Sequence, residues 1–152
     1  MARGISIHDV ASTFLSFESM THKKLQKLCY YAQAWHLALM NEPLVDDRFE
    51  AWVHGPVCPS LYDSYKGYGW QNIEQCEVPH KIKQNNEIYE FLKQIYRIYG
   101  DLDGNELELL TRMEQPWRLA RRGLEPWQPS TKEIDQDIMR KYYLEEFKRS
   151  QN

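Results

Sequence analysis

Apolar residues recur at helical spacing along most of the chain, most clearly between His22 and about Met40. Thr21 is placed to cap this segment, and Asn41 and Pro43 follow its end. One apolar stripe follows the i, i+3, i+4 rule and comprises Leu25, Leu28, Cys29, Ala32, Trp35 and Leu39. A second stripe, Tyr31, Ala34 and Ala38, occupies another face. Because a helix that is apolar on more than one face is usually buried, we expect this segment at the centre of the fold.

Capping residues and helical spacing indicate further helices. Ser6 with Asp9 forms an N-cap pair for a helix that reaches Phe17, and Ser130 with Glu133 forms a capping box for the last helix. The others are expected from Pro59 to a stop at Gly67, from Asn85 or Asn86 to Gly100, over 106–113, and from Pro116 to Gly123.

A single segment, Arg48 to His54, alternates as a strand does. Phe49, Ala51 and Val53 face one side, and we expect this strand to form a hairpin with the segment near Leu44 and to end at Gly55-Pro56. From 67 to 84 the sequence predicts a loop with a brief strand around Glu77. The predicted fold is mainly α: one compact domain over residues 1–152, with six to seven helices, one short β-hairpin near residues 44–54, a core over about 5–145 and a short C-terminal tail.

Composition and charge exclude several classes of protein. The 152 residues (18.2 kDa) carry a net charge of -3 and a pI of 6.0. The basic excess that phosphate-binding proteins usually carry is missing, which argues against nucleic acid as a partner. No apolar run approaches the ~20 residues of a membrane span, and polar residues interrupt Met1 to Phe17, which excludes a signal peptide and a membrane partner. The three cysteines form no CxxC pair, which favours a reducing compartment and a cytoplasmic location.

Known catalytic and metal-binding motifs are absent from the sequence. The pairs His54-x3-Cys58 and Cys76-x3-His80 have matching spacing and could supply four zinc ligands, but each contains a proline, and buried structural thiols are the simpler interpretation. Cys29, Ser60, His36 and His54 could in principle form a nucleophile–histidine pair. We predict no catalytic residue, no metal and no cofactor.

Aromatic and arginine side chains indicate protein binding instead. The chain has ten Tyr, five Trp and five Phe, more large rings than a core of this size needs, and such rings are enriched at protein interfaces. Arg118, Arg121 and Arg122 fall at i, i+3 and i+4, so they are expected on one side of a short helix, where they could bind a phosphate or a carboxylate-rich partner or simply be solvated. Lys23, Lys24 and Lys27 form a similar cluster on the long helix.

Three segments resemble a known family. They read KLQKLCYYAQAWHLAL from Lys24, EAWVHGPVCPSLY from Glu50 and LLTRMEQPWRLAR from Leu109. In this order and spacing they resemble the Panacea domain, the family of SocA-like and phage-associated GepA-like proteins, over about residues 5 to 145. The resemblance implies a mostly helical domain that acts without a cofactor or active site.

The resemblance also implies a function. Members commonly act as antitoxins that bind a toxin encoded next to them, and one acts as an adaptor that delivers its toxin to a cytoplasmic protease. We expect an antitoxin with a cognate protein toxin as partner; a proteolytic adaptor, a phage effector that binds a host protein, an enzyme that modifies the toxin, and a homo-oligomer stay open.

The family's motif residues fall here on Gln33, Trp52, His54, Gly55, Pro56, Thr111, Pro116 and Trp117. Where the family often has Thr-His, this chain has Thr111-Arg112, and it has no room for the DNA-binding domain that some relatives carry. The predicted partner-binding residues are Gln33, Trp52, His54, Tyr62, Trp70, Trp117, Arg118, Arg121 and Arg122.

Overall fold

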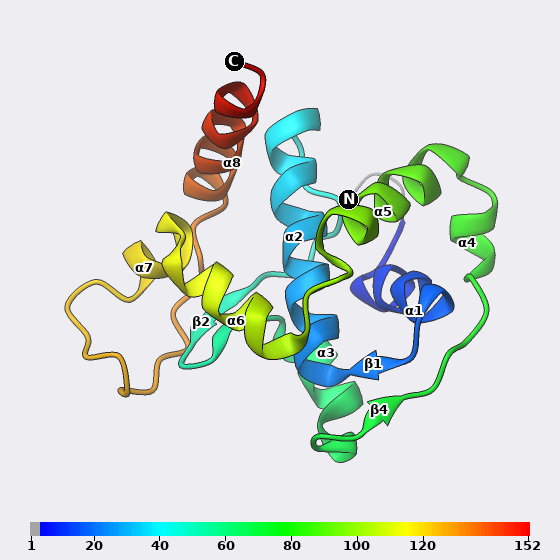
Figure 1. The fold of residues 1–152 in the computed structure, drawn as a ribbon, viewed down its shortest axis with the longest axis horizontal. Helices are drawn as coiled ribbons and strands as arrows, with labels where there is room; N and C mark the ends of the chain where they lie inside the picture. Colours follow the sequence, from blue (N-terminus) through cyan, green and yellow to red (C-terminus); the bar gives the residue numbers. More distant parts are fainter. Residues whose placement is uncertain (1–3) are drawn as a thin grey trace.

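The computed structural model describes residues 4–152; Met1–Arg3, which the predicted domain includes, lie outside the described residues. Over these residues the fold is mainly helical, as predicted, with more helices than the six to seven expected (Figure 1). The α-helices are α1 (Ile7–Phe17), α2 (His22–Met40), α3 (Pro59–Tyr65), α4 (His80–Lys83), α5 (Asn86–Tyr99), α6 (Gly104–Met113), α7 (Gln115–Ala120) and α8 (Gln136–Ser150). A 3-10 turn, η1 (Lys66–Tyr68), and the strands β1 (Met20–Thr21), β2 (Glu50–Trp52), β3 (Gly55–Val57) and β4 (Asn72–Ile73) complete the described chain.

Helix α2 lies at the centre of the fold, which confirms the prediction. Helices α1, α5, α6 and α8 and strand β3 all pack against it (Figure 1). Its rings are anchored on several sides: Tyr31 stacks on Tyr99 with ring centroids 3.9 Å apart, and the hydroxyl of Tyr30 lies 3.2 Å from that of Tyr143. Two neighbouring rings of α2 therefore join α5 and α8 to one core.

The helix ends follow the local chemistry that the sequence indicates. Ser6 and Asp9 form the predicted capping box of α1, Thr21 caps α2, and Asn41 ends α2 in the left-handed conformation with φ 60°. Asn85 caps α5 through the amide of Ile88. Each of these caps satisfies backbone groups that the helix itself leaves unpaired.

The predicted hairpin forms with a different partner strand. Strand β2 pairs with β3, which follows it after a two-residue turn at Val53 and His54, and not with the segment near Leu44. Gly55-Pro56 therefore belongs to the second strand and does not end the β-structure. Pro56 has no N–H to donate, and it is tolerated because β3 is an edge strand, where no second neighbouring strand requires that hydrogen bond.

The segment predicted to start the last helix is extended. The amide of Ala51 donates to the carbonyl of Lys132 and the amide of Ile134 to that of Phe49, both over 2.8 Å, so 132–134 lies along the free edge of β2. Ser130 and Glu133 consequently form no capping box, and Asp135 caps α8 instead. The brief strand in the long loop is β4, which pairs with β1 and lies at Asn72–Ile73, before Glu77.

Candidate partner-binding site

The second strand of the hairpin lies close against α2 and α6 at its first residue, Gly55. Its φ is +106°, and a Cβ atom at this position would lie 3.0 Å from both Lys27 Cε and Thr111 Oγ1. Only glycine combines this backbone conformation with so close an approach. The glycine thereby brings the neighbouring His54 over α6.

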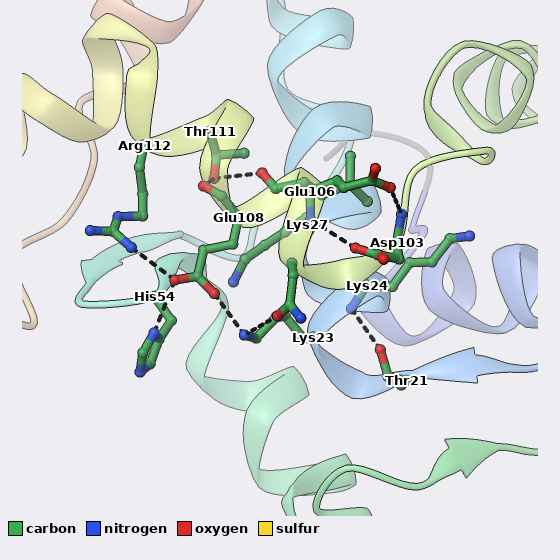
Figure 2. Close-up of polar contacts among 12 residues, drawn as sticks. Thr21, Lys23, Lys24, Lys27, His54, Asp103, Glu106, Glu108, Thr111 and Arg112 are labelled. Carbon is green, nitrogen blue, oxygen red and sulfur yellow. Dashed lines mark hydrogen bonds and ion pairs between the residues drawn. The ribbon is translucent and has the colours of Figure 1, made fainter.

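Glu108, on α6, binds three nitrogen-bearing side chains: Lys23 of α2, His54 of the hairpin turn and Arg112 of α6 itself. These four residues are called the Glu108 cluster. Lys23 Nζ lies 2.6 Å from Oε1, while His54 Nδ1 and Arg112 Nη1 lie 3.0 and 2.9 Å from Oε2 (Figure 2). Burial alone would raise the pKa of Glu108, but the hydrogen bonds and charges of Lys23 and His54 outweigh it and lower the pKa from 4.5 to about 2. The carboxylate is therefore ionised throughout the physiological range and fixes these side chains.

Lys27 lies behind the Glu108 cluster, inside the protein. Its side chain is 2% exposed, and Nζ donates to the carbonyl of Pro56 over 3.2 Å. Burial lowers its pKa from 10.5 to about 7, although the charge of Glu108 acts in the opposite direction and Lys23 adds to the lowering. The cluster therefore has beneath it a lysine that changes charge near neutral pH.

Trp117 connects the Glu108 cluster to α7. The indole is 7% exposed, and its Nε1 donates to the carbonyl of Trp52 over 2.8 Å. The guanidinium groups of Arg112 and Arg121 lie 5.4 and 5.1 Å from the indole ring centroid, within the range of cation–π attraction. Arg112, which stands where the family often has histidine, therefore contacts both Glu108 and Trp117.

The three arginines of the predicted i, i+3, i+4 set do not share one exposed face. Arg118 and Arg122 are exposed, whereas Arg121 is 5% exposed. Its guanidinium donates to the carbonyls of Ala51 (2.9 Å), Glu125 (3.2 Å) and Gln128, which ties β2 to the loop after α7. In this conformation Arg121 is a structural residue and is not available to a partner.

A surface hollow of about 490 Å³ opens between α6, α7 and the following loop, beside the Glu108 cluster; this is the α6–α7 hollow. Leu109 and Met113 of α6 are 61% and 71% exposed, and both line the hollow. The residues around it are Leu109, Arg112, Met113, Trp117, Arg118, Arg121, Arg122, Gly123, Leu124 and Pro126. Apolar side chains and arginines are thus combined on one surface, and guanidinium groups bind carboxylates in a bidentate manner.

The remaining predicted residues lie at different depths. Trp70 is 79% exposed and lies beside Lys23, whose Nζ is 5.3 Å from the ring centroid, so it borders the Glu108 cluster. Tyr62 is 36% exposed and packs on Trp52, with ring centroids 4.9 Å apart.

Gln33 is 1% exposed, and its hydrogen-bond partners lie outside this surface. Its Oε1 accepts from the amides of Leu44 and Val45 over 2.8 and 3.2 Å, and its Nε2 donates to the carbonyl of Val45 over 3.0 Å. All these bonds hold the chain that follows α2. Gln33 is therefore placed to fix the fold and cannot contact a partner directly in this conformation.

Sequence reasoning did not select Glu108, Leu109, Arg112 and Met113 as site residues. A signal was present for the ion pair, because Glu108 and Arg112 are four residues apart on a predicted helix. Leu109 and Met113 have the same spacing, on a face of α6 away from the buried Leu107 and Thr111. This apolar pair outside the buried stripe of α6 was the sequence signal that could have indicated the surface.

Among residues 4–152, no group of three or more His, Cys, Asp or Glu side chains is arranged to hold a metal ion. Cys58 is buried and lies 3.5 Å from Ser60 Oγ, while Cys76 is exposed and contacts the carbonyl of Ser12. In the same part of the chain no helix is both long and apolar enough to cross a membrane.

These observations define a helical protein that has an arginine-rich hollow beside the Glu108 cluster. The family described as "Antitoxin SocA-like, Panacea domain" matches residues 25–118, and the chain belongs to this family. The matched segment runs from α2 into α7 and includes His54, Glu108 and Arg112. The family resemblance read from the sequence is thereby confirmed.

Among curated proteins, the chain is similar to Antitoxin SocA of Caulobacter vibrioides (strain NA1000 / CB15N). The two are 26% identical over 110 residues, which cover 65% of this chain and 58% of that protein. The chain thus matches little more than half of the relative's length. No solved structure matches the chain.

Proposed function

We propose that this chain is an antitoxin that neutralises a toxin protein by direct binding, and that the α6–α7 hollow is part of the contact surface. Membership of the antitoxin SocA-like family and the name of the Caulobacter relative support the antitoxin role. Both point to a toxin as the partner in general. The location of the contact surface rests on the geometry of the hollow.

The observation that carries this location is the arginine charge of the hollow. Among residues 4–152, no carboxylate forms an ion pair with Arg118 or Arg122, and both side chains are exposed beside Leu109 and Met113. Uncompensated guanidinium groups next to exposed apolar side chains favour a partner surface with carboxylates around an apolar residue. The partner segment is thus acidic and amphipathic, although the chain as a whole is acidic too.

Binding of this kind needs no covalent step, so one antitoxin molecule neutralises one toxin molecule. A standard protein–protein interface covers about 800 Å² on each partner. The total accessible surface of this chain is 8299 Å², so such an interface would use about a tenth of it. Trp117, held by Trp52, and the arginines around it form a rigid base for the contact.

Co-expression tests this proposal. Each reading frame beside the gene is induced alone and together with this chain, and growth is measured; we expect one frame to be toxic alone and harmless with the chain. The variant Arg118→Glu reverses one charge of the hollow and should lower the affinity for the purified toxin by about tenfold or more. Arg97→Glu is the matched control, because Arg97 is also an exposed helical arginine and does not line the hollow.

Three results would separate the parts of the proposal. If no neighbouring frame is toxic, the antitoxin role is not supported. If the toxin is neutralised but Arg118→Glu and Arg97→Glu bind it equally well, the contact surface lies elsewhere. If a small fraction of antitoxin neutralises an excess of toxin, the action is catalytic and stoichiometric binding is wrong.

A further inference from the structure

A larger groove lies on another surface, where the C-terminal end of α2 meets α5 and α8. Its volume is about 700 Å³, compared with about 490 Å³ for the α6–α7 hollow, and none of its lining residues lines that hollow. Helices α5 and α8 lie on either side of α2 (Figure 1), so α2 forms the floor and the other two form the walls. We call this the α2–α5–α8 groove; its apolar lining is Trp35, Leu39, Met40, Phe91, Ile95, Ile98 and Phe147.

Several of these apolar side chains are open to solvent. Ile98 is 64% exposed, Met40 49%, Leu39 42% and Phe147 39%. They come from three helices that are far apart in the sequence, so the fold gathers them at one place. A contiguous exposed apolar patch with a polar rim is typical of an interaction site, because isolated exposed apolar residues have no reason to cluster.

The rim of the groove has one sign of charge. Every charged residue that lines it is acidic, namely Glu87, Glu90 and Glu146. Glu146 is paired with Arg149 of its own helix over 2.8 Å, whereas no ion pair is formed by Glu87 or Glu90 among residues 4–152. Glu87 lies in the first turn of α5, where a carboxylate also favours the helix dipole, but Glu90 lies beyond that turn. The negative rim is therefore available to a cationic partner.

We propose that the α2–α5–α8 groove binds an amphipathic α-helix of a partner protein, with an apolar stripe flanked by Lys or Arg. Two helices that border an apolar floor form the groove shape that such a helix fills, with anchors at i, i+3 or i+4 and i+7. The cationic flanks would face Glu87, Glu90 and Glu146. This charge requirement is opposite to that of the arginine-rich α6–α7 hollow, so the groove is a second, separate docking surface and does not depend on the antitoxin role.

Synthetic peptides of about 18 residues, or about 27 Å of helix, test the proposal by fluorescence polarisation. Three fluorescein-labelled peptides are compared: one with a leucine stripe flanked by Lys, one with the same stripe flanked by Glu, and a scrambled Lys peptide without a stripe. We expect the Lys-flanked peptide to bind at least about tenfold more tightly than the other two, since both the apolar match and the charge match are required. Equal binding of all three, or no binding, would overturn the proposal.

Variants locate the binding. Ile98→Glu should reduce binding of the Lys-flanked peptide by about tenfold or more, because it places a negative charge among the apolar side chains of the α5 wall. Trp127→Glu is the control, since Trp127 is 72% exposed and lines neither surface. Glu90→Lys should weaken the Lys-flanked peptide and strengthen the Glu-flanked one, whereas Glu77→Lys, outside the groove, should leave both unchanged.

Sedimentation of the free chain completes the test. A monomer that binds the peptide agrees with a partner helix in the groove. A dimer that Ile98→Glu dissociates and Trp127→Glu does not would assign the groove to a second copy of this chain, and the proposal of a foreign helix would be wrong.

Discussion

Gly55 lies so close to the side chain of Lys27 that a Cβ atom added to the glycine would be 3.0 Å from Lys27 Cε. This close approach joins the hairpin to the central helix at the point where the Glu108 cluster begins. Two properties of this position require glycine: the positive φ, and the lack of space for a Cβ atom.

Alanine substitutions at two glycines separate the free-energy cost of the positive φ from that of the missing space. Gly55→Ala should lower the free energy of unfolding by about 2–4 kcal/mol, because it combines backbone strain with a steric clash. Gly123→Ala is the matched control: its φ is +89°, but nothing lies within 4 Å of the added Cβ, so it should cost only about 1–2 kcal/mol. Urea denaturation of both variants gives the difference, and equal losses would mean that the hairpin moves away without cost.

Glu108→Gln should destabilise the protein by about 2–4 kcal/mol at pH 7, because it leaves the surrounding cations without their shared carboxylate. The effect depends on pH. Since the pKa of Glu108 is about 2 in the folded protein and 4.5 ordinarily, its contribution is complete above pH 4.5 and is lost as the pH falls through 2. Denaturation at pH 7 and pH 3 should therefore show a smaller difference from wild type at the lower pH. Glu145→Gln, an exposed position on α8, should change little at either pH.

Lys27→Met should stabilise the protein below neutral pH, by about 1–4 kcal/mol, because a buried cation is replaced by an apolar chain of similar length. The pKa of Lys27 is lowered from 10.5 to about 7, so between these values the folded protein binds fewer protons than the unfolded chain. Stability should consequently rise from pH 7 to pH 10 in wild type and rise less in the variant. Thermal melts over this range measure it, with the exposed Lys148→Met as the control. A variant that is less stable at pH 6 would show that the hydrogen bond to Pro56 outweighs the burial of the charge.

Glu114 has the opposite dependence on pH. Its Oε1 accepts from the hydroxyls of Tyr31 and Tyr143, both over 2.8 Å, and burial raises its pKa from 4.5 to about 7 against the effect of those bonds. The folded state therefore binds more protons between pH 4.5 and 7, and stability falls as the pH rises through that range. Glu114→Gln keeps an acceptor for both hydroxyls and should flatten the fall. A profile from pH 5 to pH 8 that is unchanged in the variant would contradict this.

The variant Gln33→Leu tests whether Gln33 stabilises the fold or binds a partner. The change leaves the amides of Leu44 and Val45 and the carbonyl of Val45 without their buried partner, so we expect a loss of about 2–4 kcal/mol in the free energy of unfolding. A variant that unfolds like wild type but no longer neutralises the toxin would return Gln33 to the set of partner-binding residues.

The sequence predicted those parts of the fold that depend on local chemistry. The cap at Thr21, the left-handed Asn41 and the Ser6–Asp9 capping box act within a few residues, and each helix end that they indicate is present. The partner strand of the hairpin was predicted wrongly because Gly55-Pro56 was interpreted as the end of the β-structure, although it begins the second strand. The segment at 130–134 was predicted wrongly because its pairing with β2 is non-local. Ala51 bonds to Lys132, some eighty residues away in the chain, and no local pattern records this bond.

The candidate site shows the same division. His54, Trp117 and Arg118 were selected from motifs and from helical spacing, and the structure brings His54 and Trp117 together through Glu108 and Arg112. The burial of Arg121 could not be predicted, because it depends on where the loop after α7 returns to β2.

The burial of α2 along most of its length, up to the exposed Leu39 and Met40, has a consequence for how such a protein can diversify. The residues that fix the fold lie on this helix, whereas Leu109, Met113, Ile98 and Phe147 project outward from helices packed around it. Exchange of exposed side chains usually changes stability by less than about 0.5 kcal/mol. Successive single substitutions at these exposed positions can therefore change the recognition specificity of the chain while the core around α2 is kept.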